Sequence, residues 1–415
     1  MTEAALAGVT ARLDELLRER IDGSATFFAA EAEPLARLCH RMAERFSRGG
    51  KLIAFGRSPA ARSDARHVAV EFVHPVIVGK RALPAIGLAG EGGDLGAQLA
   101  LVAGPEDIAI AFGTDEDGGE AARGIELARA RGCLTIAFSP AGAEWEPIPP
   151  SVDPYVRQEL IETLYHVLWE LVHVFFDHRG LLEGRDERRT HDAGASSFLY
   201  PFLGERDNEL EPVVDDVRRS VLMKAQEISD LRAQTLTDNQ EVLVAAARGL
   251  RARLDRGGKL LALGNGGSAT DAMDAVADFR IPGRPEWPPR PALDLTEDPG
   301  IITAIANDVG VELIFSRQVI AYGAPGDVLL ALSTSGNSRN VIEALAEGRR
   351  RNLETIAMVG YDGGHVASEQ LADHVIVTRS ENIPRIQEAQ ASAYHVLREL
   401  VELVGLAGLA GGGSG

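Results

Sequence analysis

Two glycine- and serine-rich segments stand out as candidate anion-binding loops. GNGGSATDAM begins at Gly264, directly after the apolar run LLAL, and STSGNS begins at Ser333, at the end of the run VLLAL. Glycines let backbone N–H groups approach an anion closely, and the N-terminus of a following helix favours negative charge. The hydroxyl groups need hydrogen-bond partners, which a phosphate group supplies. No P-loop lysine follows GNGGS, so the pattern favours a phosphate ester other than a nucleoside triphosphate.

A histidine and a glutamate four residues apart, His67 and Glu71, form a second candidate site. On a helix, this spacing places both side chains on one face, where they can bind one metal ion or one substrate. Gln158 and His166 lie eight residues apart on a later predicted helix. A rise of ~1.5 Å per residue separates them by roughly 12 Å, too far for both to bind one ion. The alternative is that His67 is an ordinary hydrogen-bonded histidine on a helix, in a copy that has lost its function and serves only as a structural scaffold.

The chain repeats itself, which indicates a duplicated domain. Three blocks recur in the same order: RGGKLIAFG (48–56) as RGGKLLALG (256–264), EDIAIAFGT (106–114) as GDVLLALST (326–334), and RQELIETLYHVLWELV as IQEAQASAYHVLRELV, which pairs Gln158 with Gln387 and His166 with His395. The spacing between matching blocks grows, so the second copy has extra residues, near ANDVGVELIFSRQV. If a glutamine and a histidine of these types bind one ion, they come from different copies of the helix.

Each copy alternates short apolar runs with predicted helices, a pattern typical of a parallel sheet covered on both faces. We therefore expect an α/β protein of two tandem domains, each a three-layer αβα sandwich with a central parallel sheet. The predicted domains are 1–180 and 211–406. The charged, glycine-rich stretch 181–210 reads as a linker, and 407–415 as a flexible tail.

The two copies have lost complementary parts of a site. In the first copy the loops are GRSPAA (56–61) and GTDEDGG (113–119), where Pro59 removes an N–H donor and the acidic residues Asp115 to Asp117 repel phosphate. In the second copy, Asp274 and Asp278 stand where the first copy has His67 and Glu71. One copy thus keeps metal and acid–base residues and the other keeps the phosphate loops, which predicts a composite active site between the domains.

The second copy resembles a known family. GNGGSxxDAM, AIANDVG, STSGNSxNVIEAL and RIQE…H are similar to the phosphoheptose isomerases, which are SIS (sugar isomerase) proteins, over about Val213 to Leu406. The resemblance implies conversion of sedoheptulose 7-phosphate to D-glycero-heptopyranose 7-phosphate, commonly with zinc. It implies substrate binding by Asn265, Gly266, Gly267, Ser268, Asp298, Ser333, Thr334, Ser335, Ser338 and Gln387.

Aldose–ketose isomerisation moves a proton between C1 and C2 through an enediol, which requires a base and an acid or metal at the carbonyl oxygen. We expect Glu71 to be the base and His166 or His395 the acid. The resemblance places zinc on His67, Glu71, Gln158 and His166. It also implies four-domain assemblies, here a homodimer forming a pseudo-tetramer. Two alternatives stay open: a non-catalytic sugar-phosphate sensor or adaptor, and an isomerase for another sugar phosphate, such as a pentose 5-phosphate.

Composition narrows the partners. The 415 residues carry a formal net charge of −19, which argues against a general nucleic-acid or anionic-membrane partner. Cys39 and Cys133 are the only cysteines, so a disulfide framework is excluded and a reducing, cytoplasmic location is expected. The N-terminal stretch lacks a signal-peptide pattern, and no apolar run reaches the ~18 residues of a membrane span.

Overall fold

The computed structural model describes residues 3–76, 80–89, 94–113, 119–178, 182 and 210–411. The acidic segment 115–117 and nearly all of the predicted linker 181–210 lie outside the described residues. The chain divides into two compact units. We call residues 23–152 and 160–227 the N-unit, and residues 1–22, 153–159 and 228–415 the C-unit. The domain boundaries at 180 and 211 stay a prediction. The C-unit includes two stretches from the first sequence copy, residues 1–22 and 153–159.

The N-unit contains a four-stranded parallel sheet in the order β2-β1-β3-β4. Its elements, with two helices that continue into the C-unit, are α1 (Glu3–Ser47), β1 (Leu52–Phe55), α2 (Pro59–Val73), β2 (Ala85–Leu88), α3 (Leu95–Val102), β3 (Ile108–Ala111), α4 (Glu120–Ala130), β4 (Leu134–Ala137) and α5 (Pro154–Asp177). Side chains of Ile53 and Phe55 pack with α3 and α4 on one face. On β1 and β2 lies α2, which carries His67.

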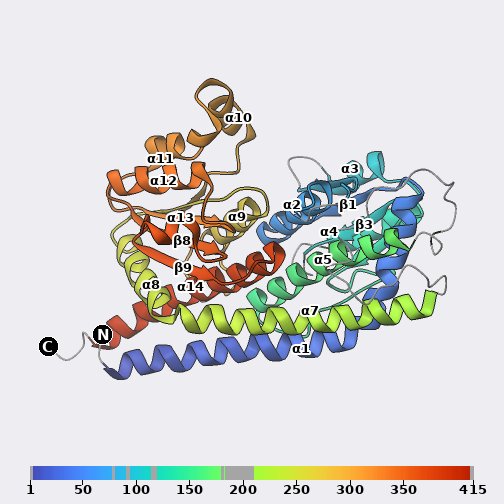
Figure 1. Ribbon diagram of the computed structural model, residues 1–415, viewed down its shortest axis with the longest axis horizontal. Helices are drawn as coiled ribbons and strands as arrows, with labels where there is room; N and C mark the ends of the chain where they lie inside the picture. The colour runs from blue at the N-terminus through green and yellow to red at the C-terminus, as the bar shows by residue number, and fades with distance from the viewer. Residues whose placement is uncertain are drawn as a thin grey trace. The chain divides into compact units, whose positions relative to one another are not determined.

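The C-unit contains a five-stranded parallel sheet in the order β6-β5-β7-β8-β9. Its elements are α7 (Leu210–Asp238, in part), α8 (Gln240–Leu254), β5 (Leu260–Leu263), α9 (Gly267–Arg280), β6 (Ala292–Asp294), α10 (Pro299–Asp308), η3 (Val311–Leu313), α11 (Ser316–Tyr322), β7 (Val328–Ser333), α12 (Arg339–Arg350), β8 (Glu354–Gly360), α13 (Gly364–Ser368), β9 (His374–Thr378) and α14 (Ile383–Gly411). Figure 1 shows α11 and α12 on one side of this sheet and α8 on the other.

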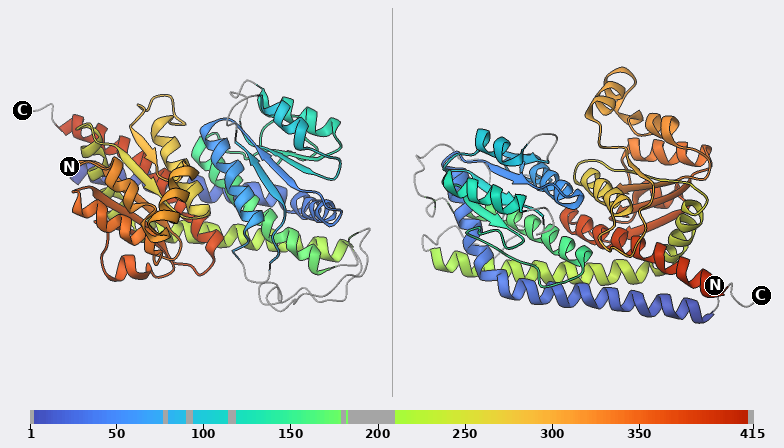
Figure 2. Two further views of the ribbon diagram at one scale, coloured as in Figure 1. Left: turned by 90° about the horizontal axis from the view of Figure 1, so that it is seen from above. Right: turned by 180° about the vertical axis from the view of Figure 1, so that it is seen from behind.

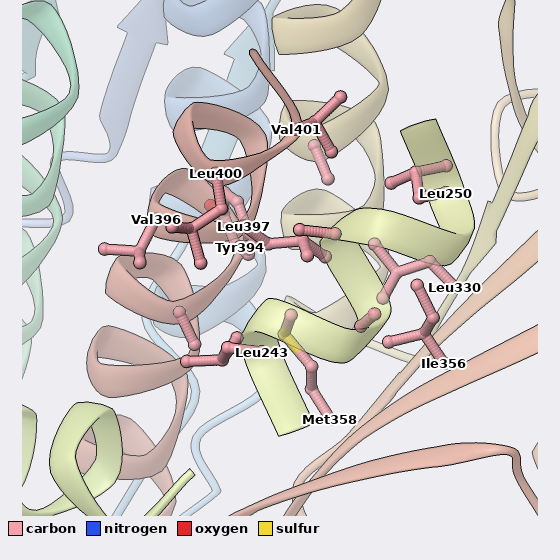
Figure 3. Packing of buried hydrophobic residues seen from close by; sticks show 14 of the residues in the cluster. Leu243, Leu250, Leu330, Ile356, Met358, Tyr394, Val396, Leu397, Leu400 and Val401 are labelled. Atoms are coloured by element: carbon pink, nitrogen blue, oxygen red, sulfur yellow. The ribbon is translucent and has the colours of Figure 1, made fainter. Parts of the chain in front are cut away.

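Alternate residues of each central strand bury opposite faces of the C-unit sheet. Leu260 and Leu330 pack with α8, α9 and α14, whereas Leu261 and Leu329 pack with α11 and α12. Figure 3 shows the first of these cores, and the two views of Figure 2 show the layers from other sides. Continuous apolar strands follow from burial on both faces. The expected three-layer αβα sandwich is therefore confirmed.

The structure also explains the growing spacing between the copies. Between β6 and β7, the second copy has α10, η3 and α11. Between β2 and β3, the described residues of the first copy form α3. The strands β2, β6 and β9 were not among the predicted apolar runs. Among the described helices, none combines the length and the apolar character that crossing a bilayer requires.

Ion pairs and apolar contacts tie the early stretches into the C-unit. Arg20 pairs with Glu159 at 2.7 Å, and Arg12 pairs with Glu399 at 2.8 Å. Leu13 and Leu16 belong to the same buried core as the sheet. The C-unit therefore needs residues from outside the second copy to complete its core and to pair its buried charges.

This architecture predicts that the second copy is unstable alone. A fragment of residues 211–406 loses Arg20 and Glu159 together with the two leucines. Since each buried leucine side chain contributes about 2–5 kcal/mol, urea unfolding followed by circular dichroism should show a clear loss of stability. Co-expression of residues 1–180 should restore the midpoint of the intact chain. A fragment that unfolds at the midpoint of the intact chain without its partner would contradict the assignment of these stretches to the C-unit.

Candidate active site

The two glycine- and serine-rich loops lie together at one edge of the C-unit sheet. Their strands, β5 and β7, are hydrogen-bonded neighbours, so the carboxyl ends of both point to the same edge. Asn265 of the first loop and Asn340 at the start of α12 exchange two amide hydrogen bonds of 2.9 Å. Open parallel sheets bind ligands at this edge. The loops therefore form one continuous polar surface, which we call the cradle: residues 264–268 and 333–338.

Two helices begin at the cradle without a side chain that caps them. At the N-cap of α9 stands Gly266, with φ of 58°, and at the N-cap of α12 stands Ser338, whose side chain makes no capping hydrogen bond. The first N–H groups of a helix lack intrahelical partners and carry a partial positive charge. Gly336, with φ of 63°, has no room for a Cβ, which would lie 2.2 Å from the Gly363 oxygen. Such uncapped termini suit an anion.

Serine hydroxyl groups of the cradle accept local bonds and keep a proton to donate. Ser333 Oγ accepts from the Gly336 N–H, and Ser335 Oγ accepts from the Asn337 N–H, each at 3.2 Å. Ser268 is buried near the start of α9, whereas Thr334 is half-buried. A hydroxyl group that accepts one bond can still donate another. The predicted phosphate-binding residues of the two loops are thus close together.

The corresponding helix start in the first copy is closed by its own side chain. Ser58 Oγ accepts a hydrogen bond from the Ala61 N–H at 3.3 Å, and Pro59 stands at the first helical position of α2. Gly56 packs so closely that a Cβ would lie 2.5 Å from that of Ala61. An occupied cap offers fewer donors to a ligand than an open one. The contrast agrees with a phosphate role for the second copy.

Two predicted substrate-binding residues lie outside the loops. Asp298 is exposed at the N-cap of α10, where Oδ1 accepts a 3.0 Å hydrogen bond from the Ile301 N–H. Gln387 is buried on α14, two turns before His395. The cap uses Oδ1 of Asp298. The other carboxylate oxygen, Oδ2, can accept a hydrogen bond from a sugar hydroxyl group.

A buried cluster in the N-unit brings together residues of α2 and α5. His67 Nε2 and His166 Nε2 lie 3.4 Å apart, and Glu71 Oε1 lies 3.9 Å from His67 Nε2. Glu162 has a carboxylate oxygen within 4.8 Å of both rings. On its other side, His67 Nδ1 lies 2.9 Å from the hydroxyl group of Tyr165. We call His67, Glu71, Glu162 and His166 the first cluster.

The first cluster fits a zinc ion. Two imidazole nitrogens that are each ~2.0–2.1 Å from a tetrahedral zinc ion would lie about 3.3–3.4 Å apart. The two Nε2 atoms lie 3.4 Å apart. Burial, and secondarily the neighbouring His166, hold the pKa of His67 well below its usual value. The neutral ring is the form that binds a metal, so donor types, spacing and protonation state agree.

The residues whose ligand atoms all lie within 4.8 Å of one another are His67, Glu162 and His166, and the predicted ligands Glu71 and Gln158 are not among them. Glu162, on α5 one turn before His166, joins the two histidines, and sequence analysis did not single it out. Its spacing from His166 is the i,i+4 spacing that drew attention to His67 and Glu71, so the signal was present. Gln158 belongs to the C-unit, where its Nε2 donates a 2.7 Å hydrogen bond to Asp274. The structure therefore does not group Gln158 with the first cluster.

A second buried cluster lies in the C-unit, on α9 and α14. His395 Nε2 lies 3.3 Å from Asp274 Oδ2 and 3.5 Å from Asp278 Oδ2. Gln158 and Tyr394 donate hydrogen bonds to the two oxygens of Asp274, at 2.7 and 2.8 Å. Gln158 and His395, the histidine of the other copy, thus both contact Asp274. We call Asp274, Asp278 and His395 the second cluster; they too have ligand atoms within 4.8 Å of one another.

Electrostatics favour the charged forms of His395 and of its neighbour Glu159. Burial lowers the pKa of His395, but Asp274, Asp278 and Glu159 outweigh it and raise that pKa to about 10. Burial raises the pKa of Glu159, but Arg20, His395 and Arg232 hold it well below its usual range. Burial, then the charge of Asp274, raise the pKa of Asp278 well above its usual value. The imidazolium form of His395 can donate a proton, and Asp278 is a stronger base than an exposed aspartate.

Part of the chain, including residues 225–360 of the second copy, is similar to known proteins. Residues 225–360 match the family described as the SIS domain. Phosphoheptose isomerase of Nitratidesulfovibrio vulgaris is 40% identical over 188 residues, which are 45% of this chain and 89% of the relative. Phosphoheptose isomerase of Chlorobium phaeobacteroides is 45% identical over 174 residues, 41% of this chain and 76% of that relative.

Solved structures resemble the whole chain in fold. The C-terminal domain of glucosamine-fructose-6-phosphate aminotransferase from Francisella tularensis has a TM-score of 0.59 at 7% identity and covers 94% of both chains. Tagatose-6-phosphate ketose/aldose isomerase from Escherichia coli has a TM-score of 0.55 at 12% identity, over 95% of this chain and 93% of that one. Tandem SIS folds therefore account for both copies. With relatives at 40% identity that it spans almost completely, the chain belongs to the phosphoheptose isomerase family of SIS-domain proteins.

Proposed function

We propose that the chain is an aldose–ketose isomerase that acts on a sugar phosphate. The observation that carries the proposal is the cradle: two uncapped helix N-termini and their hydroxyl groups meet at one sheet edge. Helix α9 begins there and also carries Asp274 and Asp278. The relatives named phosphoheptose isomerase support sedoheptulose 7-phosphate as substrate and D-glycero-heptopyranose 7-phosphate as product.

In this proposal the cradle binds the phosphate group through backbone N–H groups and hydroxyl donors. Hydrogen bonds to a charged acceptor contribute more than neutral ones, and several converge here. Asp298, at the start of α10, would accept hydrogen bonds from sugar hydroxyl groups. Because the phosphate lies at one end of the sugar, this anchoring places C1 and C2 away from the cradle, where acid–base groups act.

The proton transfers need one base and one acid. The base removes a proton from C1 of the ketose while the carbonyl oxygen at C2 gains a proton, which yields the enediol. The base then returns its proton to C2 as the O1 proton leaves, and the aldose forms. Glu71 is the proposed base, with His166 or His395 as the acid. Asp278 is the second candidate base, because it shares a unit and a helix with part of the cradle and has a raised pKa.

We also propose zinc as a cofactor, held by the first cluster. His67, Glu71, Glu162 and His166 would supply two nitrogens and two carboxylates, a donor set that suits this ion. When bound, zinc supplies a Lewis acid that polarises a carbonyl oxygen. A homodimer that forms a pseudo-tetramer of SIS domains, a composite site between the domains, and a cytoplasmic location remain part of the proposal.

A second candidate function is a non-catalytic sugar-phosphate sensor. The observation in its favour is that the second copy has Asp274 and Asp278 in place of the His and Glu of the first copy, with Asp274 hydrogen-bonded to Gln158 and Tyr394. Incubation of the purified chain with a panel of ketose phosphates separates the two, with NMR spectroscopy of the sugars as readout. An isomerase produces an aldose phosphate, whereas a sensor binds a ligand and leaves it unchanged.

Ser338→Ala should weaken sugar-phosphate binding, because it removes a hydroxyl donor that makes no capping bond in the free protein. Loss of one hydrogen bond to a charged group is worth ~1.5–3 kcal/mol, so Kd in isothermal titration calorimetry should rise about 10- to 150-fold. The matched control is Ser58→Ala, which removes the cap of α2 and should cost about 1 kcal/mol of stability without a change in Kd. Equal effects of the two variants on Kd would contradict the assignment of the cradle.

Metal content should depend on the first cluster. His67→Ala and Glu162→Gln should lose most of the zinc that the purified wild-type chain retains after dialysis, because each removes one of few ligands. Gln158→Ala serves as the contrast, since Gln158 hydrogen-bonds Asp274 in the C-unit, and its zinc content should stay near the wild-type level. Mass spectrometry of total metal is the measurement. Full zinc retention in Glu162→Gln, with loss in Gln158→Ala, would restore the ligand set expected from the sequence.

The two candidate bases give opposite expectations in turnover. If Glu71 is the base, Glu71→Gln should reduce kcat by about 100-fold or more while sugar-phosphate Kd changes little, because the cradle lies on other elements. Asp278→Asn should then be milder. The reverse order of the two kcat values would identify Asp278 as the base and would remove the need for a composite site. Both variants are conservative in volume, so far-ultraviolet circular dichroism suffices as the folding control.

A further inference from the structure

We propose that Glu159, supplied by the first sequence copy, is a positioning residue for His395 of the second copy. The inference rests on the proposed function and goes beyond it, because it names how the acid of the second cluster is oriented. Glu159 lies in the stretch 153–159, which belongs to the C-unit. The sequence alone did not identify Glu159 as a candidate functional residue.

The contact itself is short, direct and buried. His395 Nδ1 lies 2.9 Å from Glu159 Oε1, and neither residue is more than 1% exposed. A carboxylate only accepts hydrogen bonds, so the hydrogen between the two atoms belongs to Nδ1. The bond therefore selects the ring protonation at Nδ1 and fixes the plane of the imidazole.

Fixing Nδ1 aims the other ring nitrogen at the acidic pair. Nε2 of His395 lies 3.3 Å from Asp274 and 3.5 Å from Asp278, but it makes no hydrogen bond with correct geometry to any described residue. Asp278 Oδ2 is likewise buried and lacks a hydrogen-bond partner among the residues that the structure describes. A proton-transfer group must be held in direction, and the bond at Nδ1 holds Nε2 toward the two aspartates.

Glu159 is itself held from several sides. Arg20 of α1 donates to both carboxylate oxygens, with Nη2 at 2.7 Å from Oε1 and Nε at 2.9 Å from Oε2. The Ser392 hydroxyl group donates to Oε2 at 2.5 Å, and it accepts in turn from Arg232 Nε at 3.0 Å. A two-pronged guanidinium contact fixes the plane of a carboxylate as well as its charge. The orientation of Glu159 is thus transmitted to the ring of His395.

This arrangement makes the second cluster dependent on the first copy. Glu159 follows Gln158, which donates to Asp274, so one turn of α5 contacts both ends of the cluster. On α14 itself, Gln387 and Glu388 match Gln158 and Glu159, and Glu388 pairs with Arg385 at 2.5 Å. In the C-unit, a residue of the first sequence copy therefore positions the histidine of the second copy.

The test is a double-mutant cycle on the full chain. Glu159→Gln keeps the volume of the side chain and removes its charge, and it should lower kcat about 10- to 100-fold with little change in KM, because the cradle is untouched. His395→Gln should lower kcat more, about 100- to 10,000-fold. If Glu159 acts through His395, the double variant should equal His395→Gln. Losses that multiply in the double variant would overturn the proposal.

Two further variants separate positioning from stability. Glu170→Gln removes another buried carboxylate of α5, which pairs with Lys224 in the N-unit, and should lower the unfolding temperature while kcat stays within about twofold of wild type. Arg20→Lys keeps the positive charge but loses the two-pronged contact. It should lower kcat about 3- to 10-fold, and this loss should vanish in the His395→Gln background. These variants also decide the case if Glu159→Gln does not fold.

A spectroscopic arm keeps this inference distinct from the proposed activity. In 15N-histidine-labelled wild-type protein, the His395 Nδ1–H should give a strongly downfield proton resonance, assigned by its loss in His395→Gln. The resonance should weaken or move in Glu159→Gln and stay in Glu170→Gln. An unchanged resonance in Glu159→Gln overturns the positioning role. Absence of turnover on every ketose phosphate, with the resonance behaving as expected, refutes the activity alone.

Discussion

The buried ion pair between Arg20 and Glu159 is the contact on which the C-unit depends. Both side chains are at most 3% exposed, and a buried carboxylate without a partner would cost several kcal/mol. Arg20 comes from α1, Glu159 from α5 and its further partners from α7 and α14. The pair therefore requires stretches far apart in the chain to fold together. For this reason a compact unit differs from a sequence copy, although each copy contains the strands of one sheet.

The two clusters lie at matching positions of the two sequence copies, and both are buried. Their different side chains give them different chemistry. In the first cluster, burial and the neighbouring His166 disfavour the charged form of His67, and a neutral ring suits a metal ion. In the second cluster, one imidazole lies among three carboxylates, and these favour the charged ring against burial. Replacement of His67 and Glu71 by Asp274 and Asp278 at the matching places removes one nitrogen donor and adds negative charge around the remaining histidine. These replacements, with Ala391 in place of Glu162 and Glu159 beside His395, separate a zinc-type donor set from a protonated acid.

Sequence reasoning predicted the elements well and their partners only in part. Repeated apolar runs predicted β1, β3, β4, β5, β7 and β8, because strands buried on both faces have an unbroken apolar pattern. It missed β2, β6 and β9, which are short or only partly buried. His67 and His166 were singled out and lie together. Glu162 was missed because its counterpart in the second copy is Ala391, so the comparison of copies gave no signal there. The placement of Gln158 and Glu159 depends on which helices cross, and spacing along one helix does not contain that information.

Capping explains how one copy keeps a ligand site while the other loses it. Parallel strands followed by helices bring several helix N-termini to one edge, so each copy inherits the same potential anion site. In the first copy, Ser58 turns its hydroxyl oxygen back onto the Ala61 N–H and thereby satisfies a donor that an anion would need. In the second copy, Gly266 has no side chain to do this and Ser338 does not do it. Whether a helix terminus serves the fold or a ligand is therefore decided by one residue at its start, and the rest of the sheet and helices can stay the same.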